Sequence, residues 1–177
     1  MRAACGKYLR LNAEMKGYLD VLRGKVIPKS AKRVLGVVAR GTDYRYAGFD
    51  LPKPMDDEDY IALVQEKMEQ WDCDYLLVAT EDATILKRFE QAGFGDRLLF
   101  VEQERYEYTE KEKAGILVAD LKSKKHNYRD EMPYLSVLYL LSECCALISN
   151  CRCGAYEVAD FMNGNRYEYR YCCGEEA

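Results

Sequence analysis

Three short polar segments of this chain each directly follow an apolar run, and two of them contain residue types that bind phosphate groups. Arg40-Gly41-Thr42-Asp43 follows the first run, Thr80-Glu81-Asp82 the second, and the segment from Ser149 to Gly154 the last. A planar guanidinium with five donors suits a phosphate or diphosphate, and backbone amides at a helix start form an anion site. This pattern predicts one binding site whose candidate residues are Arg40, Gly41, Thr42, Asp43, Asp82, Ser149, Asn150, Cys153 and Gly154.

Each segment also has a purely structural interpretation. Arg40 can pair with Asp43 on a surface turn, and Asp82 can cap the helix that follows it, as aspartate often does. Both alternatives stay open at the level of sequence. No G-x-G-x-x-G or G-x(4)-G-K-[ST] motif occurs, so the sequence supports neither a dinucleotide fingerprint nor a P-loop.

The apolar runs that precede these segments are typical of parallel strands covered on both faces. We expect strands at 33–39, 74–80, 97–101 and 145–149. Helical spacing predicts helices at 12–22, from the acidic cluster 56–59 through Met68, from Glu81 to about Ala92, at 133–142 and at 154–162. The acids at 56–59 fit a helix start, and Glu102–Arg129 is expected to be a long loop on the active face with at most one short helix. The alternation predicts an α/β fold, a three-layer αβα Rossmann-like domain with a mainly parallel sheet.

Composition limits the organisation and the partners of the chain. The 177 residues suit one main domain, 31–177, preceded by a helix and connector at 1–30. A formal net charge of −4 argues against a general nucleic-acid binder. No stretch approaches the roughly 18 apolar residues of a spanning helix, and no apolar segment near the start is long enough for a signal peptide. A cytoplasmic protein without a transmembrane segment is expected.

The chain has eight cysteines and one histidine, His126. In a cytoplasmic protein such a count does not predict a disulfide framework. Two adjacent pairs and one Cys-x-Cys do not match the C-x(2–4)-C spacing of zinc sites, and Cys144 and Cys145 lie in an apolar run where cysteine acts as a small hydrophobe. We therefore expect no metal and no cofactor.

Taken in order, strand–Arg-Gly-Thr-Asp-Tyr, strand–Thr-Glu-Asp and Leu-Ile-Ser-Asn-Cys-x-Cys-Gly-Ala-Tyr resemble the donor-binding, C-terminal half of the GDP-fucose fucosyltransferase superfamily. That group includes α1,2-, α1,6- and protein O-fucosyltransferases. The resemblance covers about Val34 to Gly164. The family's first motif resembles His-x-Arg-Arg-Gly-Asp; matched on Arg-Gly, Arg40 takes the second arginine, while Val37 and Ala39 stand at the histidine and first arginine.

The resemblance implies that Arg40 grips the β-phosphate, that Asp82 lies near the base, and that Ser149 and Asn150 contact phosphate, with Cys153 or Gly154 near the position of a later serine. It also implies a GT-B glycosyltransferase that is inverting and metal-independent, with GDP-fucose or a related nucleotide sugar as donor and a glycan acceptor bound by an N-terminal domain. This chain begins one helix before the nucleotide domain, so it is expected to be a piece of a longer protein or a shortened relative. A transferase domain, a non-catalytic nucleotide-sugar-binding module and an α/β scaffold without a nucleotide site all remain open.

Overall fold

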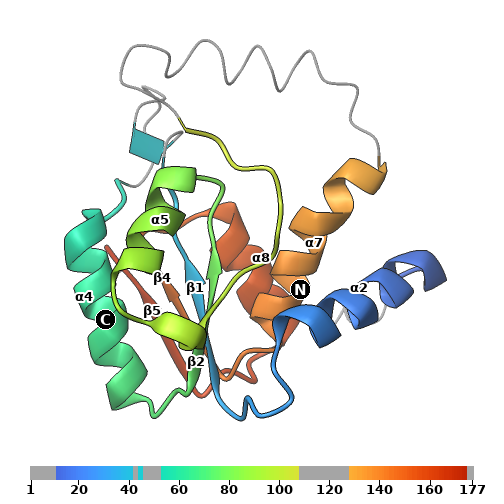
Figure 1. Cartoon of the computed structure of the whole chain (residues 1–177), viewed down its shortest axis with the longest axis horizontal. Helices are drawn as coiled ribbons and strands as arrows, with labels where there is room; N and C mark the ends of the chain where they lie inside the picture. The colour runs from blue at the N-terminus through green and yellow to red at the C-terminus, as the bar shows by residue number, and fades with distance from the viewer. Residues whose placement is uncertain (1–10, 42–43, 46–52, 108–127, 175–177) are drawn as a thin grey trace.

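The computed structural model describes residues 11–41, 44–45, 53–107 and 128–174. They form a five-stranded, all-parallel sheet in the order β3-β2-β1-β4-β5 (Figure 1). The strands are β1 (Val34–Val38), β2 (Tyr75–Ala79), β3 (Leu98–Leu99), β4 (Ala146–Ser149) and β5 (Tyr169–Cys172). The predicted α/β fold with a parallel sheet is confirmed, and its predicted strands are all present, although β3 is shorter than expected.

Helices cover both faces of the sheet (Figure 1). They are α2 (Ala13–Val26), α4 (Asp57–Gln70), α5 (Ala83–Gln91), the short 3-10 helix η1 (Gly95–Arg97), α7 (Tyr128–Ser142) and α8 (Gly154–Asn163). Side chains within a strand point to one face of the sheet or the other, and each face has its own core. Leu35 and Val37 pack with α4 and α5, whereas Val38 packs with α2, α7 and α8. This period of two, with apolar side chains on both faces, gives the three layers.

Three elements differ from the sequence prediction. The fifth strand, β5, was not predicted, because it is an edge strand whose first three residues are exposed and it lacks a continuous apolar run. Helix α7 begins at Tyr128, inside the segment expected to be a loop, because Pro133 lies within the helix and does not start it. Proline removes one backbone donor without always ending a helix. Helix α2 likewise continues past Gly24 to Val26.

The strand order places a topological switch point between β1 and β4. From β1 the chain proceeds through β2 to β3 on one side, and β4 and β5 fill the other side. In open parallel sheets, ligands bind outside the carboxyl ends of the strands at such a point. The residues that directly follow β1 and β4 are therefore the first place to look for a site.

Candidate functional site

The ends of β1 and β4 are joined by one buried asparagine. The Arg40 backbone N–H donates to Asn150 Oδ1 at 2.9 Å, and Asn150 Nδ2 donates to the Arg40 carbonyl at 2.8 Å. The Asn150 backbone N–H donates in turn to Val38, and its carbonyl accepts from Met55. Asn150 has no exposed surface. Its side chain thus fixes the backbone of Arg40 at the switch point.

The Arg40 side chain lies against the end of β2. Its Nη1 donates to Glu81 Oε2 at 2.7 Å, and its Cζ lies 4.8 Å from the centre of the Tyr44 ring. The Arg40 side chain is only 14% exposed, whereas that of Glu81 is 41% exposed. Glu81 belongs to a segment that the sequence singled out, yet only its neighbour Asp82 was predicted as a site residue. The alternative pairing of Arg40 with Asp43 concerns a residue outside the described ones.

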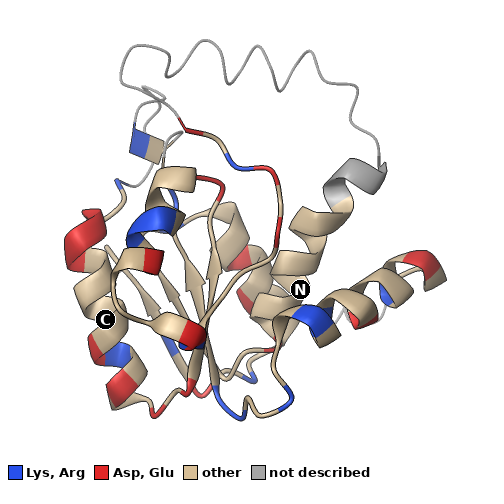
Figure 2. Cartoon of the chain, viewed as in Figure 1, with Lys and Arg blue, Asp and Glu red and all other residues tan. Residues whose placement is uncertain are grey.

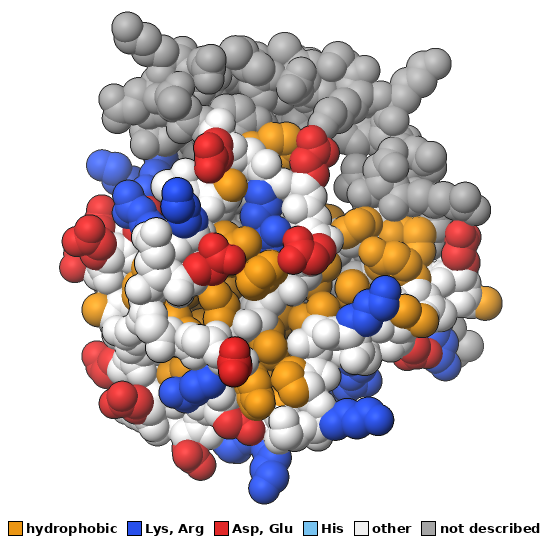
Figure 3. All heavy atoms as spheres, in the orientation of Figure 1, with side chains coloured by type: hydrophobic (Ala, Val, Ile, Leu, Met, Phe, Trp, Pro, Cys, Tyr) orange, Lys and Arg blue, Asp and Glu red, His pale blue; other side chains and the backbone are white. Residues whose placement is uncertain are grey.

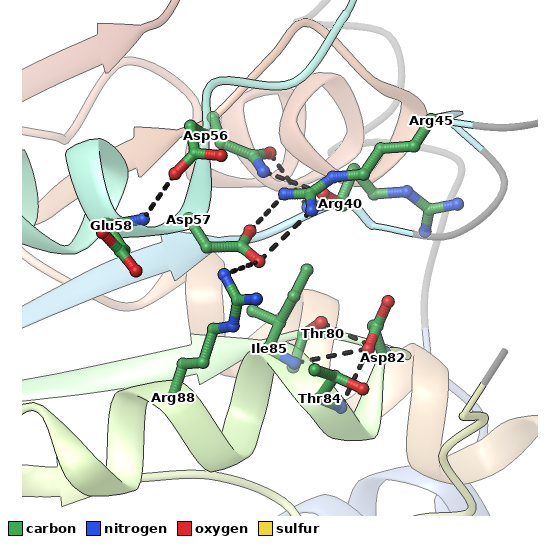
Figure 4. Close-up of polar contacts among 11 residues, drawn as sticks. Arg40, Arg45, Asp56, Asp57, Glu58, Thr80, Asp82, Thr84, Ile85 and Arg88 are labelled. Atoms are coloured by element: carbon green, nitrogen blue, oxygen red, sulfur yellow. Dashed lines mark hydrogen bonds and ion pairs between the residues drawn. The ribbon is translucent and has the colours of Figure 1, made fainter. Parts of the chain in front are cut away.

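Asp82 caps helix α5, which was one of its two expected roles. Its Oδ1 accepts from the backbone N–H groups of Thr84 at 2.9 Å and Ile85 at 3.3 Å (Figure 4). Gly41 packs directly against it, because a Cβ placed on Gly41 would lie 2.5 Å from Asp82 Oδ2 and 2.7 Å from Ile85 Cδ1. Glycine at 41 therefore lets the turn after β1 approach the first turn of α5.

Two further arginines, Arg45 and Arg88, contact one carboxylate, that of Asp57. The Asp57 carboxylate at the start of α4 accepts hydrogen bonds from Arg45 and forms an ion pair with Arg88 at 2.9 Å (Figure 4). Its side chain is only 4% exposed. Of the acids expected to serve the helix start, Asp56 does cap α4 through Glu58 N–H, whereas Asp57 holds the two arginines. Sequence reasoning missed this cluster, since nothing in the spacing couples Asp57 to arginines on two other segments.

The acidic first turn of α4 is visible in Figure 2. On the face that Figure 3 shows, acidic and basic side chains are interspersed. Positive charge at the strand ends is therefore local and comes from individual arginines such as Arg40.

Ser149, the last residue of β4, lies beside Cys153, which directly precedes α8. The Ser149 hydroxyl donates to the Cys151 carbonyl at 2.6 Å, and its Oγ lies 4.0 Å from Cys153 Sγ. Cys153 is the N-cap residue of α8, and Gly154 is the first residue of that helix. A hydrogen bond from the Cys151 thiol lowers the pKa of Cys153 to about 6; burial opposes this shift, while the Tyr156 amide and the Arg40 guanidinium favour it.

The cavity between these elements is small. It has a volume of about 20 Å³ and is lined by Arg40, Thr80, Glu81, Gln103 and Tyr134 together with apolar side chains. That volume holds about one water molecule. Burial raises the pKa of Tyr134, as does the nearby Glu81.

The structure thus brings most of the predicted site residues to one edge of the sheet. Arg40 contacts Asn150, Gly41 lies against Asp82, and Ser149 lies against Cys153. Thr42 and Asp43 are outside the described residues. Within the described ranges, no three His, Cys, Asp or Glu side chains are arranged to hold a metal ion. The helices of these ranges include none with the length and apolar composition to cross a membrane.

The fold and the position of this site define a Rossmann-like αβα domain with polar strand ends at its switch point. Its structure is similar to that of NodZ α-1,6-fucosyltransferase soaked with GDP-fucose, with a TM-score of 0.52 and 16% identity over 86% of this chain and 43% of that one. NodZ from Bradyrhizobium gives a TM-score of 0.53 at 15% identity, covering 89% of this chain and 43% of that chain.

POFUT1 in complex with GDP gives a TM-score of 0.59 at 10% identity, covering 96% of this chain and 50% of that one. The predicted resemblance to the fucosyltransferase superfamily is therefore confirmed at the level of the fold. This chain spans half or less of the length of the solved structures that it matches. No protein-family model and no curated protein sequence matches it.

Proposed function

We propose that this chain is the nucleotide-sugar-binding domain of a fucosyltransferase-like glycosyltransferase. One observation carries the proposal: Asn150 fixes Arg40 at the switch point of a sheet whose fold is similar to that of NodZ and POFUT1, which have been solved with GDP-fucose or GDP. The donor is GDP-fucose or a related nucleotide sugar.

In this proposal Arg40 binds the diphosphate, which takes the position beside the guanidinium that the Glu81 carboxylate holds in the structure. A carboxylate and a phosphate oxygen both accept from a guanidinium, so an incoming diphosphate can replace Glu81 Oε2, now 2.7 Å from Arg40 Nη1. The amides at the start of α8 supply further donors. Asp82 caps α5, and in this proposal it also lies near the base, as the resemblance implies.

The proposed reaction is an inverting displacement. A hydroxyl of a glycan acceptor attacks the anomeric carbon and loses its proton to solvent water, the bond from that carbon to the diphosphate oxygen breaks, and GDP leaves with the electron pair. Arg40 and the α8 amides stabilise the negative charge that develops on the leaving group. This step needs no metal ion, because fixed donors supply the stabilisation.

A second candidate is a domain that binds the nucleotide sugar without transferring it. The observation that favours it is the first motif, in which Val37 and Ala39 stand where the superfamily's motif has its histidine and first arginine. Both candidates require GDP binding, and only the first requires fucose transfer when an acceptor and any partner half are supplied.

Calorimetry with GDP, GDP-fucose and UDP tests the proposal. We expect a preference for the guanine nucleotides, and we expect Arg40→Ala to weaken GDP binding by about tenfold to a hundredfold, because a charge-assisted hydrogen bond contributes about 1.5–3 kcal/mol. Arg40→Lys should recover only part of the loss, since an ammonium lacks the planar fork.

Arg23→Ala is the matched control, because Arg23 is an exposed arginine on α2 whose partner is Glu143. It should leave GDP affinity unchanged. No binding of the parent at millimolar GDP, or equal affinity of the parent and Arg40→Ala, would refute the proposed function.

A further inference from the structure

A pair of thiols lies at the amino end of the sheet, opposite the candidate nucleotide site. Cys73 precedes β2 and Cys145 precedes β4, and their Sγ atoms are 3.8 Å apart although 72 residues separate them in sequence. They meet across the start of β1, where the Cys145 backbone N–H donates to the Val34 carbonyl. Cys73 is 4% exposed, whereas Cys145 is half-buried and reaches solvent.

An anchored arginine shares a partner with one of the two thiols, because Arg33 and the Cys73 thiol both donate to the Trp71 carbonyl, at 3.0 and 3.7 Å. Arg33 donates to the carbonyls of Trp71 and Asp72, each at 3.0 Å, and its guanidinium is held by both oxygens of Glu168 at 2.9 and 3.1 Å. These four bonds hold its charge in a defined place beside the sulfurs. A fixed cation near a cysteine favours the thiolate, which is the nucleophilic form.

The two sulfurs differ in protonation. The hydrogen bond from Cys73 lowers the pKa of Cys145 to about 7, with Arg33 acting in the same direction against burial. The same hydrogen bond, together with burial, raises the pKa of Cys73 far above its usual value. The pair therefore consists of a half-buried cysteine, whose thiol also donates to the Val34 carbonyl at 3.4 Å, and a buried cysteine directly behind it. Reactive cysteines with a neighbouring resolving cysteine have this arrangement.

We propose that Cys145 and Cys73 are a reversible disulfide-forming site that reacts with small-molecule disulfides, Cys145 as the attacking sulfur and Cys73 as the resolving one. The Cys145 thiolate attacks one sulfur of the small disulfide, the S–S bond breaks, and one small thiolate leaves and takes up a proton. Cys73 then loses its proton and attacks the Cys145 sulfur, which expels the second small thiol. Two protein thiols are oxidised and one small disulfide is reduced to two thiols.

The geometry leaves a short distance to close. A disulfide bond is about 2.05 Å long, so the sulfurs must approach by about 1.8 Å from their separation of 3.8 Å. Both cysteines lie just before their strands, but the Cys145 backbone is hydrogen-bonded to Val34 and Glu168. A disulfide also requires Cα atoms about 4.4–6.8 Å apart, so any backbone shift falls to the segment around Cys73. The bond would connect the starts of β2 and β4 across β1 and restrain the unfolded chain, which raises the melting temperature.

Cys144 provides a matched control. It neighbours Cys145 in sequence but is 5% exposed, whereas Cys145 is half-buried. Burial raises the pKa of Cys144 above its usual value. It therefore should react slowly, and Cys144→Ala should leave the behaviour of the pair unchanged.

The test treats the whole chain with mixtures of oxidised and reduced glutathione, stops exchange with acid, and maps thiols and cross-links by peptide mass spectrometry. We expect a Cys73–Cys145 cross-link that dithiothreitol reverses, and a melting temperature several degrees higher in the oxidised form. Cys73→Ser should stop at a glutathione adduct on Cys145, at least about tenfold faster than any on Cys144. Cys145→Ser should give neither product at these positions.

The result is interpretable whether or not each variant is stable. Melting curves of the reduced proteins show which variants are folded, and the parent alone decides the main point through the identity of its first cross-link. A first cross-link between other cysteines, or no cross-link at all in glutathione mixtures, would overturn the proposal. So would preferential labelling of Cys73 over Cys145. GDP affinity should not change on oxidation, because the pair lies at the other end of the sheet.

Discussion

Replacing Asn150 with alanine tests the connection on which the candidate site depends. The substitution leaves the N–H and the carbonyl of Arg40 without their partners at 2.9 and 2.8 Å, in a place with no exposed surface. An unsatisfied buried backbone group costs about 1–3 kcal/mol. For the two groups, with some relaxation, we expect a loss of about 3 kcal/mol. In a chain of 177 residues this lowers the melting temperature by about 6–12 °C.

The assay combines thermal melting with GDP calorimetry at a temperature where the variant is fully folded. We expect GDP affinity to fall about tenfold or more, since Arg40 is no longer held at the switch point. Asn163→Ala is the matched control. Asn163 is also buried, its amide donates to Ser142 at 2.8 Å, and its Oδ1 accepts backbone N–H groups beyond the end of α8. It should lose comparable stability and keep the parent's GDP affinity.

Two results would refute this reasoning. A change in melting temperature of less than about 2 °C for Asn150→Ala would mean that its two hydrogen bonds do not hold the strand ends together. An equal loss of GDP affinity in Asn163→Ala would mean that general loosening, and not the position of Arg40, controls binding.

Three further predictions concern the same edge of the sheet. Gly41→Ala should lose about 1–3 kcal/mol of unfolding free energy, measured by urea denaturation, because its Cβ would clash with Asp82. In the control Gly17→Ala, nothing lies within 4 Å of the new Cβ on an exposed helix face, so the variant should gain about 0.5–1 kcal/mol. Asp57→Asn should lose about 2–3 kcal/mol, because a nearly buried carboxylate that holds two arginines becomes neutral; an unchanged urea midpoint would contradict this. Rising pH deprotonates Cys153, whose pKa is about 6, and places a negative charge near Arg40, so GDP affinity of the parent should fall from pH 5 to pH 7. Cys153→Ser should show a smaller fall, and parallel pH profiles for both proteins would exclude the thiolate as the cause.

The central strands were predictable because their signal is local. The segments 35–38 and 146–148 are buried on both faces and therefore appear as uninterrupted runs without a polar side chain. The polar turns at their ends were found for the same reason, since a parallel sheet brings all strand ends to one edge. The edge strand β5 has no such signal, because exposed Tyr169, Arg170 and Tyr171 make up most of its length.

The sequence by itself therefore determined four of the five strands, the layers and the edge that carries the polar residues. Only the tertiary structure decided which side chains pair there. Several acids lie close to Arg40 in the sequence, yet its side chain contacts Glu81, 41 residues away. Cys73 and Cys145, 72 residues apart, meet because the strands that follow them, β2 and β4, both pair with β1. Local sequence patterns report burial and backbone preference, whereas the partner of a long polar side chain depends on strand order and register, which are set by the packing of the whole domain.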